Sequence, residues 1–590
     1  MPFDTTSLSK SLQAARIGIP AKRYILLCGL MAVGASILWT IIWILGITTG
    51  LTNIITGISK TLIFILFSII FPAGVFAFAY AYPSLTASGR KSKINLDLPY
   101  AITYMQALST TIPLLDIFRS VYESDDLYGE VSKECGVIIR DVDVFGADLI
   151  TAIENTRNTT PSDKFKELLN DLLMVYRSGG DLRNFFNAKS DSYRELAKNE
   201  LESSMQFLEI IAEVYVTVFV AGPIAIMIML VAQSLAGTAA VGNLMPVMYI
   251  GLPVGAIIII MVLYLLLPQS TLTISKKEVR GSEFPLGIIR NPEQPLDEKF
   301  EKKFQQKKQI NKITSILRHP VMFYISSYIP SVFFGAVFAA AVFFFWNQGI
   351  LASLFPKSTP LTLVCLVIIA FMLPIAAAYE IRNRYVSGIE KQLPEFLREI
   401  SDMRDIGMTL PSAIKLIAEN KSGVLTSELK IVSKELNYGS SLSGALVRME
   451  NRVGLTNVKR SISLLVRASE VTDFIREILA IAVGDLEHYL KMKSKRFSAS
   501  FAYVAIIYLS YGIFLFTAYV ILGSFVGTFE TMHVSFDIAS STQDMFIISI
   551  ILAAFSGIMA GQMASNTPLA GLKHSMIMLI IAIVIFVFIL

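Results

Sequence analysis

Long apolar runs alternate with charged segments along this chain. A helix needs about 20 apolar residues to cross a bilayer, and nine runs approach that length. They cover residues 24–47, 60–82, 210–235, 245–267, 323–346, 361–379, 498–523, 545–563 and 574–590. The pattern predicts nine transmembrane helices. The first run is too long for a signal-peptide core and lacks a small-residue cleavage site, so we interpret it as a retained helix.

Two charged insertions and a charged linker separate these runs. Each insertion has two predicted membrane helices before it and two after it, which indicates a parallel internal repeat followed by one extra helix. We expect seven consecutive segments, in which membrane segments alternate with the first helical domain, the linker and the second helical domain. The expected boundaries, in that order along the chain, are 1–82, 83–209 (first domain), 210–267, 268–321 (linker), 322–379, 380–497 (second domain) and 498–590.

Short motifs recur in the two insertions. Leu98-Pro99 matches Leu393-Pro394 at an offset of 295 residues, and Phe145-Gly146 matches Tyr438-Gly439 at an offset of 293. Two motifs at nearly the same offset support a duplication of the whole domain.

Both insertions have the periodicity of amphipathic helices. The apolar positions that open the second insertion are Leu393, Phe396, Leu397, Ile400, Met403 and Ile406. Gly407 is expected to end this helix, and Thr409 is placed to cap the next one, with Pro411 in its first turn. The first insertion breaks at Ile112-Pro113.

The later helices of the insertions also have start signals. Asp148 and Ser441 are N-cap candidates at matching places. No Gly or Pro interrupts residues 181–209 or 485–511, so we expect the last helix of each insertion to continue into the bilayer. Each would project roughly 40 Å from the membrane at 1.5 Å per residue.

Composition agrees with a membrane protein. The chain is 54% hydrophobic and 16% charged, with a mean hydropathy of +0.59, whereas soluble domains carry about 25% charged residues. The predicted fold is therefore an all-α polytopic membrane protein with about nine transmembrane helices and two duplicated cytoplasmic helical-bundle domains. The net charge of +5 is explained by the positive-inside bias of membrane proteins, so no nucleic-acid partner is expected.

The distribution of basic residues predicts the orientation. The loops 48–59, 236–244, 347–360 and 524–544 contain one basic residue between them, Lys357. The basic loops are cytoplasmic by the charge rule. This places the N-terminus inside and the C-terminus outside a cell membrane.

Motifs of enzymes are absent from the sequence. No Gly-Lys dipeptide occurs, so the chain has no P-loop of its own, and neither H-E-x-x-H nor G-x-S-x-G is present. Cys28, Cys135 and Cys365 have no spacing of a disulfide or metal site. We expect no catalytic, cofactor-binding or metal-binding residues. The predicted spans are almost free of ionisable residues apart from Glu213, which makes a polytopic transporter the weaker alternative.

The duplicated motifs resemble the type II secretion F family, the platform proteins of type IV pilus-like machines. The second copy has Leu393-Pro394, GMTL at 407–410, YGSSLSGAL at 438–446 and RASEVTDF at 467–474. The first has Leu98-Pro99, FGADLITAI at 145–153 and YRSGGDL at 176–182, with Ile112-Pro113 where the family has Gly. Nine spans around two such domains are similar to the archaeal branch, which includes the archaellum platform protein and its pilus relatives.

The resemblance implies a mechanical role without enzymatic activity or cofactors. A cytoplasmic hexameric secretion ATPase would press on the platform, and pilin or archaellin subunits would be added from the membrane lipid. It also implies a homo-oligomer, with a dimer favoured. An archaellum is the first expectation for the filament, and an adhesion pilus or a type II-like secretion system is the alternative.

The two insertions differ in charge. Residues 83–209 hold 14 basic and 20 acidic residues, a balance of −6, and residues 380–497 hold 19 and 15, a balance of +4. Ordinary divergence of solvated surfaces and engagement of different partners are both open. We expect a basic tip on the second insertion from 404–411, 448–460 and 467–476, docking the ATPase. Its basic residues are Arg404, Arg448, Arg452, Lys459, Arg460, Arg467 and Arg476.

Overall fold

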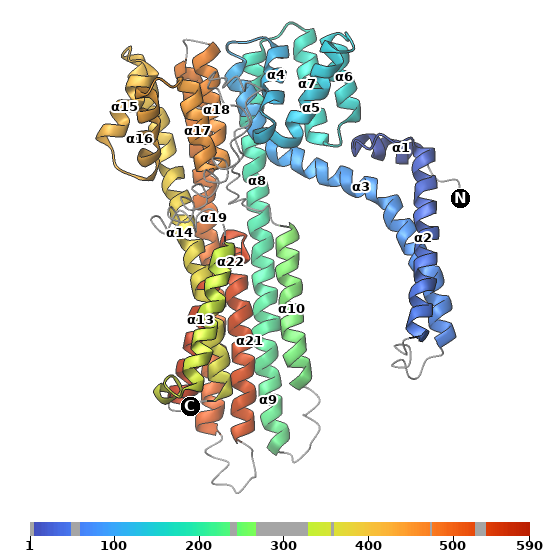
Figure 1. Ribbon diagram of the computed structural model, residues 1–590, viewed down its shortest axis with the longest axis vertical. Coiled ribbons are helices and arrows are strands. Elements are labelled where there is room, and N and C mark those ends of the chain that lie inside the picture. Colours follow the sequence, from blue (N-terminus) through green and yellow to red (C-terminus); the bar gives the residue numbers. More distant parts are fainter. Residues whose placement is uncertain are drawn as a thin grey trace, which may run out of the picture. The chain divides into compact units, whose positions relative to one another are not determined.

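Helices form all the regular structure in the part of the chain that is described (Figure 1). The computed structural model describes residues 5–48, 60–235, 245–266, 328–355, 359–471, 475–525 and 538–590. The predicted all-α fold is confirmed for these residues. The linker at 268–321 lies outside them, as do the loop 236–244 and most of 48–59 and 524–544.

The chain packs as two compact units. The first contains residues 1–197 and 467–481, and the second contains 198–466 and 482–590. This division follows packing and passes through two long helices, so it does not test the expected domain boundaries, which stay a prediction.

The first unit contains two N-terminal helices and most of the helices of the first insertion. They are α1 (Thr5–Ala14), α2 (Ala21–Thr48), α3 (Lys60–Leu108), α4 (Leu114–Glu123), α5 (Asp125–Asp143), α6 (Leu149–Thr159), α7 (Asp163–Arg177) and the beginning of α8 (Leu182–Val216). The break predicted at Ile112-Pro113 is confirmed, because Pro113 directly precedes α4. Asp148 caps α6 as predicted, and its carboxylate accepts hydrogen bonds from the N–H groups of Ile150 and Thr151.

The second unit contains the second insertion and most of the apolar helices. They are α9 (Gly222–Leu235), α10 (Met245–Leu266), α13 (Ile329–Asn347), α14 (Pro360–Asp405), α15 (Leu410–Asn420), α16 (Val424–Asn437), α17 (Leu442–Val453), α18 (Thr456–Val471), α19 (Ile475–Tyr519), α21 (Ile538–Ser565) and α22 (Pro568–Ile583). The last turns of α18 and the first of α19 belong to the first unit.

Seven helices in the described part of the chain are long and apolar enough to cross a membrane. They correspond to seven of the nine predicted spans, and a shorter apolar helix at Met248–Tyr264 corresponds to the fourth. The remaining predicted span, 60–82, falls in the first half of α3. The chain is therefore an integral membrane protein.

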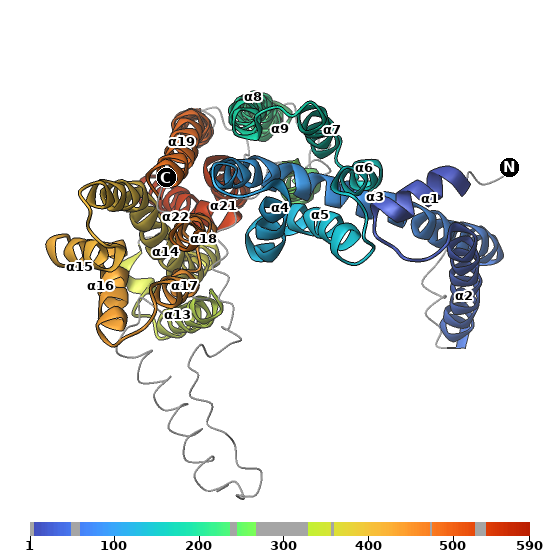
Figure 2. The same ribbon diagram turned by 90° about the horizontal axis from the view of Figure 1, so that it is seen from above.

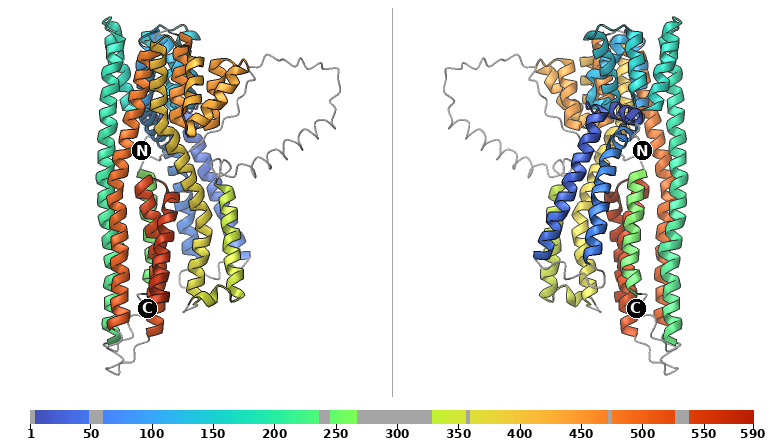
Figure 3. Two further views of the ribbon diagram at one scale, coloured as in Figure 1. Left: turned by 90° about the vertical axis from the view of Figure 1, so that its left-hand side faces the viewer. Right: turned by 90° about the vertical axis from the view of Figure 1, so that its right-hand side faces the viewer.

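Three of these helices extend well beyond their apolar segments. The candidate spans Leu182–Met229, Pro360–Asp405 and Ile475–Gly523 have 48, 46 and 49 residues, whereas about 20 cross a bilayer. The prediction that uninterrupted helices connect each insertion to the membrane is confirmed. Figure 3 shows the long course of α8, α14 and α19.

Local signals act as predicted at most helix ends. Gly407 follows α14 with a φ of +84°, and Ser441 caps α17 by accepting a hydrogen bond from the N–H of Gly444. Thr409 does precede α15, with Pro411 in the first turn. Thr409 is therefore the N-cap residue as predicted, but its hydroxyl donates to the Ser412 hydroxyl at 2.9 Å and makes no capping hydrogen bond to the backbone.

The apolar face predicted for the end of α14 forms much of the core of its bundle. Leu393, Phe396, Leu397 and Ile400 are buried. Ile406 departs from the prediction because α14 ends one residue before it, and its side chain is 78% exposed.

Candidate functional site

The second unit carries a helical bundle at the end of α14 opposite its apolar half, and we call this the distal end of the unit. Figure 2 shows α14, α15, α16 and α17 grouped there. Lys421, just after α15, binds Glu395 of α14 at 2.9 Å. The N–H of Leu425 on α16 donates to Gln392 Oε1 at 3.0 Å. Helix α15 thus runs back along α14, and α16 returns, so the α14–α15 and α16–α17 turns lie at the distal end.

Large apolar side chains project from both distal turns of the second unit. Tyr438 in the α16–α17 turn is 90% exposed, the most of any large hydrophobic residue described, and Ile406 in the α14–α15 turn is 78% exposed. Each is followed by a glycine with positive φ, Gly439 at +87° and Gly407 at +84°. Glycine adopts that conformation without steric cost, which lets the next helix start immediately and holds the turn tight.

The first unit has the equivalent feature. Phe145 lies in the α5–α6 turn, is 70% exposed and is followed by Gly146 with a φ of +63°. The Arg140 guanidinium lies 5.5 Å from the centre of the Phe145 ring. Asp143, at the end of α5, binds Arg119 of α4 at 3.0 Å, so this turn also lies at the end of the bundle reached by α3.

An exposed aromatic therefore occupies the same turn in both copies. Single hydrophobic residues scattered over a surface are common and do not by themselves indicate a binding site. Aromatic residues that are held on tight turns, however, are the side chains that anchor protein–protein interfaces. We regard Phe145, Tyr438 and Ile406 as the candidate docking residues. The sequence indicated the Phe145 and Tyr438 equivalence but not their exposure, which depends on the direction of the helices.

The residues of the expected basic tip do not all lie together at the distal end of the second unit. Asn457, at the start of α18, donates to Glu390 Oε1 of α14 at 3.2 Å. Glu390 precedes the end of α14 by 15 residues, which is about 20 Å of helix. The prediction that 448–460 lies at the distal end is wrong, because the α17–α18 junction lies at the opposite end of the bundle.

Four of the seven basic residues lie within the bundle of the second unit. Arg448 binds Glu435 at 2.9 Å, and Arg452 bridges Glu428 at 3.0 Å and Glu435 at 2.8 Å. Lys459 is only 5% exposed, and Arg460 is half-buried on the same helix. The docking of an ATPase by these four residues stays a prediction.

The other three residues have different places. Arg404 lies in the last turn of α14, at the distal end of the second unit. Arg467 and Arg476 belong to the first unit, where Arg467 is paired with Glu123 of α4 and Arg476 is exposed at the start of α19. The docking of an ATPase by Arg404 and Arg476 stays a prediction.

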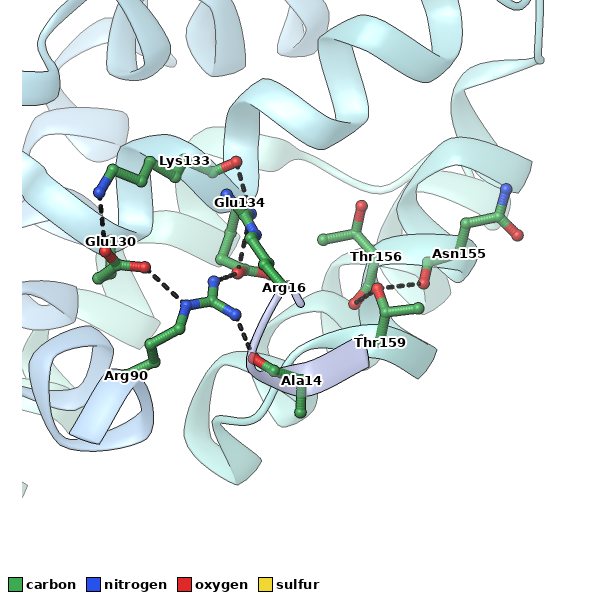
Figure 4. A network of polar contacts seen from close by, with 9 residues as sticks. All are labelled: Ala14, Arg16, Arg90, Glu130, Lys133, Glu134, Asn155, Thr156 and Thr159. Atoms are coloured by element: carbon green, nitrogen blue, oxygen red, sulfur yellow. Dashed lines mark hydrogen bonds and ion pairs between the residues drawn. The ribbon is translucent and has the colours of Figure 1, made fainter. Parts of the chain in front are cut away.

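A buried ionic network holds the other end of the first unit (Figure 4). Arg90 of α3 binds Glu130 at 2.8 Å and Glu134 at 2.5 Å, both on α5, and also donates to the carbonyl of Ala14 at the end of α1. Arg16 binds Glu134 at 3.0 Å. Burial raises the pKa of Glu130, but hydrogen bonds from Lys133 and Arg90 outweigh it and lower the pKa to about 2.

In the second copy, an arginine from a different helix neutralises the equivalent buried carboxylate. Glu428 lies 294 residues after Glu134, and its side chain is similarly buried. Its partner is Arg452 of α17, whereas Arg90, the partner of Glu134, lies on the long entering helix. The copies therefore share a buried carboxylate but not the way in which it is neutralised.

No group of three or more His, Cys, Asp or Glu residues that could hold a metal ion occurs in the described ranges.

Comparisons with known proteins relate this duplication to one family and to archaeal proteins. A family model described as type II secretion system (T2SS), protein F, matches residues 105–230 and 396–523. An uncharacterized protein of Methanocaldococcus jannaschii is 25% identical over 516 residues, which are 86% of this chain and 82% of that protein. Flagella accessory protein J of the same organism is 27% identical over 176 residues, 28% of this chain and 31% of that protein. No solved structure matches the chain.

Proposed function

Because the chain belongs to the type II secretion system protein F family and carries two copies of its domain, we propose that it is the membrane platform of an archaeal type IV pilus-like machine. Proteins of this family are non-enzymatic membrane components that associate with a secretion ATPase and with pilins. The platform couples a cytoplasmic ATPase to filament assembly, and it does so by transmitting force.

The observation that carries this proposal is the continuity of the long helices. Helix α14 runs as one helix from an apolar segment at Pro360 to Asp405, next to the distal turn, and accommodates Pro374 and Pro394 in its interior. Backbone hydrogen bonds along a helix resist bending and compression, so a push on the distal turn is transmitted to the apolar half. An element of this kind suits a coupling protein better than a catalyst.

The distal turns supply the contact for the ATPase. Tyr438 and Ile406 in the second unit, and Phe145 in the first, project apolar surface where a partner can cover it. Covering a large aromatic side chain contributes more to binding than most polar contacts at an interface. Arg404 and Arg476 add positive charge that steers an acidic partner surface.

The kind of filament is open to two proposals. The similarity to flagella accessory protein J supports an archaellum. The similarity to the uncharacterized protein extends over 86% of the chain against 28% for flagella accessory protein J, so an adhesion pilus or a secretion filament is the second proposal. Deleting the gene distinguishes them, because loss of swimming indicates an archaellum and loss of surface attachment with normal swimming indicates a pilus.

The docking role is tested by replacing the exposed aromatics. In cells that carry the Phe145→Ser and Tyr438→Ser variant, a tagged pilus-type secretion ATPase should co-purify at least tenfold less, and filaments should be lost. The fraction of protein in the membrane should be unchanged, because neither side chain packs in a core. Ile431→Ser, which changes an exposed apolar residue in the middle of α16, is the matched control and should bind normally.

Two results would count against these proposals in different ways. Normal ATPase binding by the double variant removes the distal turns from the mechanism but leaves the platform role. Failure of the unaltered protein to bind any secretion ATPase, together with normal filaments in a deletion strain, overturns the platform role itself.

A further inference from the structure

A cluster of three charged residues lies in the second unit, where the apolar parts of α14 and α22 meet. Lys573 Nζ of α22 lies 3.3 Å from Glu380 Oε2 of α14, and Arg384 Nε, one turn further along α14, lies 3.7 Å from Glu380 Oε1. The two helices pack against each other (Figure 2). The Arg384 and Lys573 side chains are 81% and 48% exposed, so both basic groups lie on the surface of the unit.

The lengths of the two helices place this cluster at the edge of a bilayer. Residues 360–379 of α14 are 20 positions without a charged side chain. They span about 30 Å, which is the thickness of a hydrocarbon core. Residues 574–590 are also uncharged and span about 25 Å. Because Glu380 follows the first stretch and Lys573 precedes the second, their contact brings the ends of both stretches to one level.

Exposed apolar side chains continue from the cluster along both helices. On α22, Ile577, Ile580 and Val584 follow the lysine by four, seven and eleven residues and are 45–48% exposed. On α14, Leu373 precedes the arginine by eleven residues and is 48% exposed. Side chains at these intervals share one face of a helix. The basic groups therefore lie at the end of an apolar surface that lipid chains can cover.

Aromatic side chains occur at the same level of the second unit. The Tyr508 hydroxyl of α19 lies 3.0 Å from Nδ1 of His574, the residue after the lysine. Tyr379, the residue before the glutamate, exchanges a hydrogen bond with the Thr567 hydroxyl at 2.9 Å. Tyrosine is enriched where a membrane meets water, so these residues agree with the helix lengths in placing the cluster at the level of the lipid headgroups.

The charges of the cluster do not balance. Two cations share one carboxylate. The 3.7 Å from Arg384 to Glu380 is too long for a hydrogen bond, and Arg384 makes no hydrogen bond to another residue in the described ranges. A guanidinium group matches two phosphate oxygens, and a lysine adds a point charge. One ionised phosphate diester would bring the net charge of the cluster from +1 to zero.

We propose that Arg384 and Lys573 bind the phosphate of an anionic phospholipid whose acyl chains lie along the exposed faces of α14 and α22. Glu380 lies between the two cations and weakens their attraction for the phosphate. A zwitterionic lipid carries its own ammonium group, which already neutralises its phosphate, so an anionic lipid is preferred. This inference requires only that the chain spans a membrane and does not rest on the proposed platform role.

Photoactivatable lipids test the site. The full-length protein is placed in phosphatidylcholine vesicles that contain a trace of phosphatidylglycerol or phosphatidylcholine with a diazirine on one acyl chain, and labelled peptides are identified by mass spectrometry. Peptides of α14 and α22 that flank the cluster should be labelled about tenfold more by the phosphatidylglycerol probe, because each basic residue near a membrane surface strengthens anionic-lipid binding by about fivefold. Equal labelling by the two probes would overturn the proposal.

The R384Q and K573Q double variant should lose this preference and label equally with both probes. Lys391→Gln is the matched control, because Lys391 is exposed on α14 two turns beyond Arg384 and its loss removes the same charge further from the apolar surface. The control should keep the preference. A preference that persists in the double variant, or that falls as much in the control, would show general attraction to a basic surface and overturn the site.

Glu380→Gln separates lipid binding from a purely structural ion cluster. A lipid site predicts that removing the carboxylate raises phosphatidylglycerol labelling, whereas a cluster that only holds α14 against α22 predicts lower labelling together with a lower midpoint of thermal unfolding. R384Q alone should keep the midpoint in phosphatidylcholine, so its loss of labelling does not reflect unfolding. Excess inorganic phosphate should not displace the lipid, since it lacks acyl chains; full displacement would show a free-anion site and overturn the proposal.

Discussion

At the residue scale, arginine side chains neutralise a buried carboxylate at one end of each helical bundle. Near the membrane side, Arg90 and Arg452 neutralise the buried carboxylates Glu134 and Glu428. Removing one partner from such a pair leaves an uncompensated charge in a medium of low polarity. A triple reversal of Arg452, Lys459 and Arg460 would therefore unfold the bundle, and a loss of filaments in that variant would not report on docking.

Arg90→Met is expected to destabilise the first unit by about 3–5 kcal/mol. The change leaves Glu134 with Arg16 alone and removes a donor that lowers the pKa of Glu130. Because the pKa of Glu130 is depressed from 4.5 to about 2, it contributes stability that is present above pH 4.5 and lost as pH falls toward 2. In the variant that loss should occur at higher pH, measured as the midpoint of acid unfolding in detergent.

The matched control is Arg119→Met. Arg119 is substantially exposed and binds Asp116 and Asp143 on the surface, so the variant should lose less than about 1 kcal/mol. Equal effects of the two substitutions would contradict the structural role assigned to the Arg90 network.

At the scale of elements, the closest packing in the described chain joins α21 to α22. A side chain on Gly561 would collide with the backbone of Gly571, and one on Gly557 with the backbone of Ser575. Small residues let membrane helices approach closely, and van der Waals contact then replaces the hydrophobic effect, which is absent in lipid. This hairpin is the part of the membrane region most sensitive to side-chain size.

Gly561→Val should therefore separate α21 from α22 and destabilise the protein by about 1–3 kcal/mol. Thermal unfolding of the purified protein, followed by its loss from the size-exclusion peak, measures the change. Gly512→Val on α19 is the control, since a Cβ there meets no described atom within 4 Å. A Gly561 variant as stable as the Gly512 variant would show that the hairpin tolerates a wider spacing.

At the scale of the whole molecule, the orientation in the membrane is the property that the proposed mechanism requires. The proposed partner is a cytoplasmic ATPase, so the proposal requires the distal turns to face the cytoplasm. The single basic residue in the four predicted external loops, Lys357, supports this orientation.

Cysteines introduced at two exposed serines test the orientation. A membrane-impermeant maleimide should label Ser353→Cys, after α13, in intact cells, and should label Ser427→Cys, on α16, only after permeabilisation. The three native cysteines are buried and should give little background. Strong labelling of the Ser427 variant in intact cells would invert the orientation and exclude a cytoplasmic partner at the distal turns.

The sequence by itself determined the helices, the repeat and most helix ends of this protein. Apolar length, a period near 3.6 and turn residues such as Gly407 and Ser441 act over a few neighbouring residues, so they can be interpreted without the fold. The motifs at offsets of 293 and 295 identified equivalent positions in the same way.

Only the tertiary structure decided where those positions lie. The burial of Lys459, the exposure of Ile406 and Tyr438, and the contacts of Arg183 with Glu477 and of Lys495 with Glu202 all depend on how helices far apart in the chain pack. Residues 448–460 were predicted at the wrong end of the bundle. Helical periodicity identifies which face of a helix is buried, but it does not show which end of a neighbouring helix lies beside its first residue. That direction is determined by long-range packing, which brings together residues that no local pattern connects.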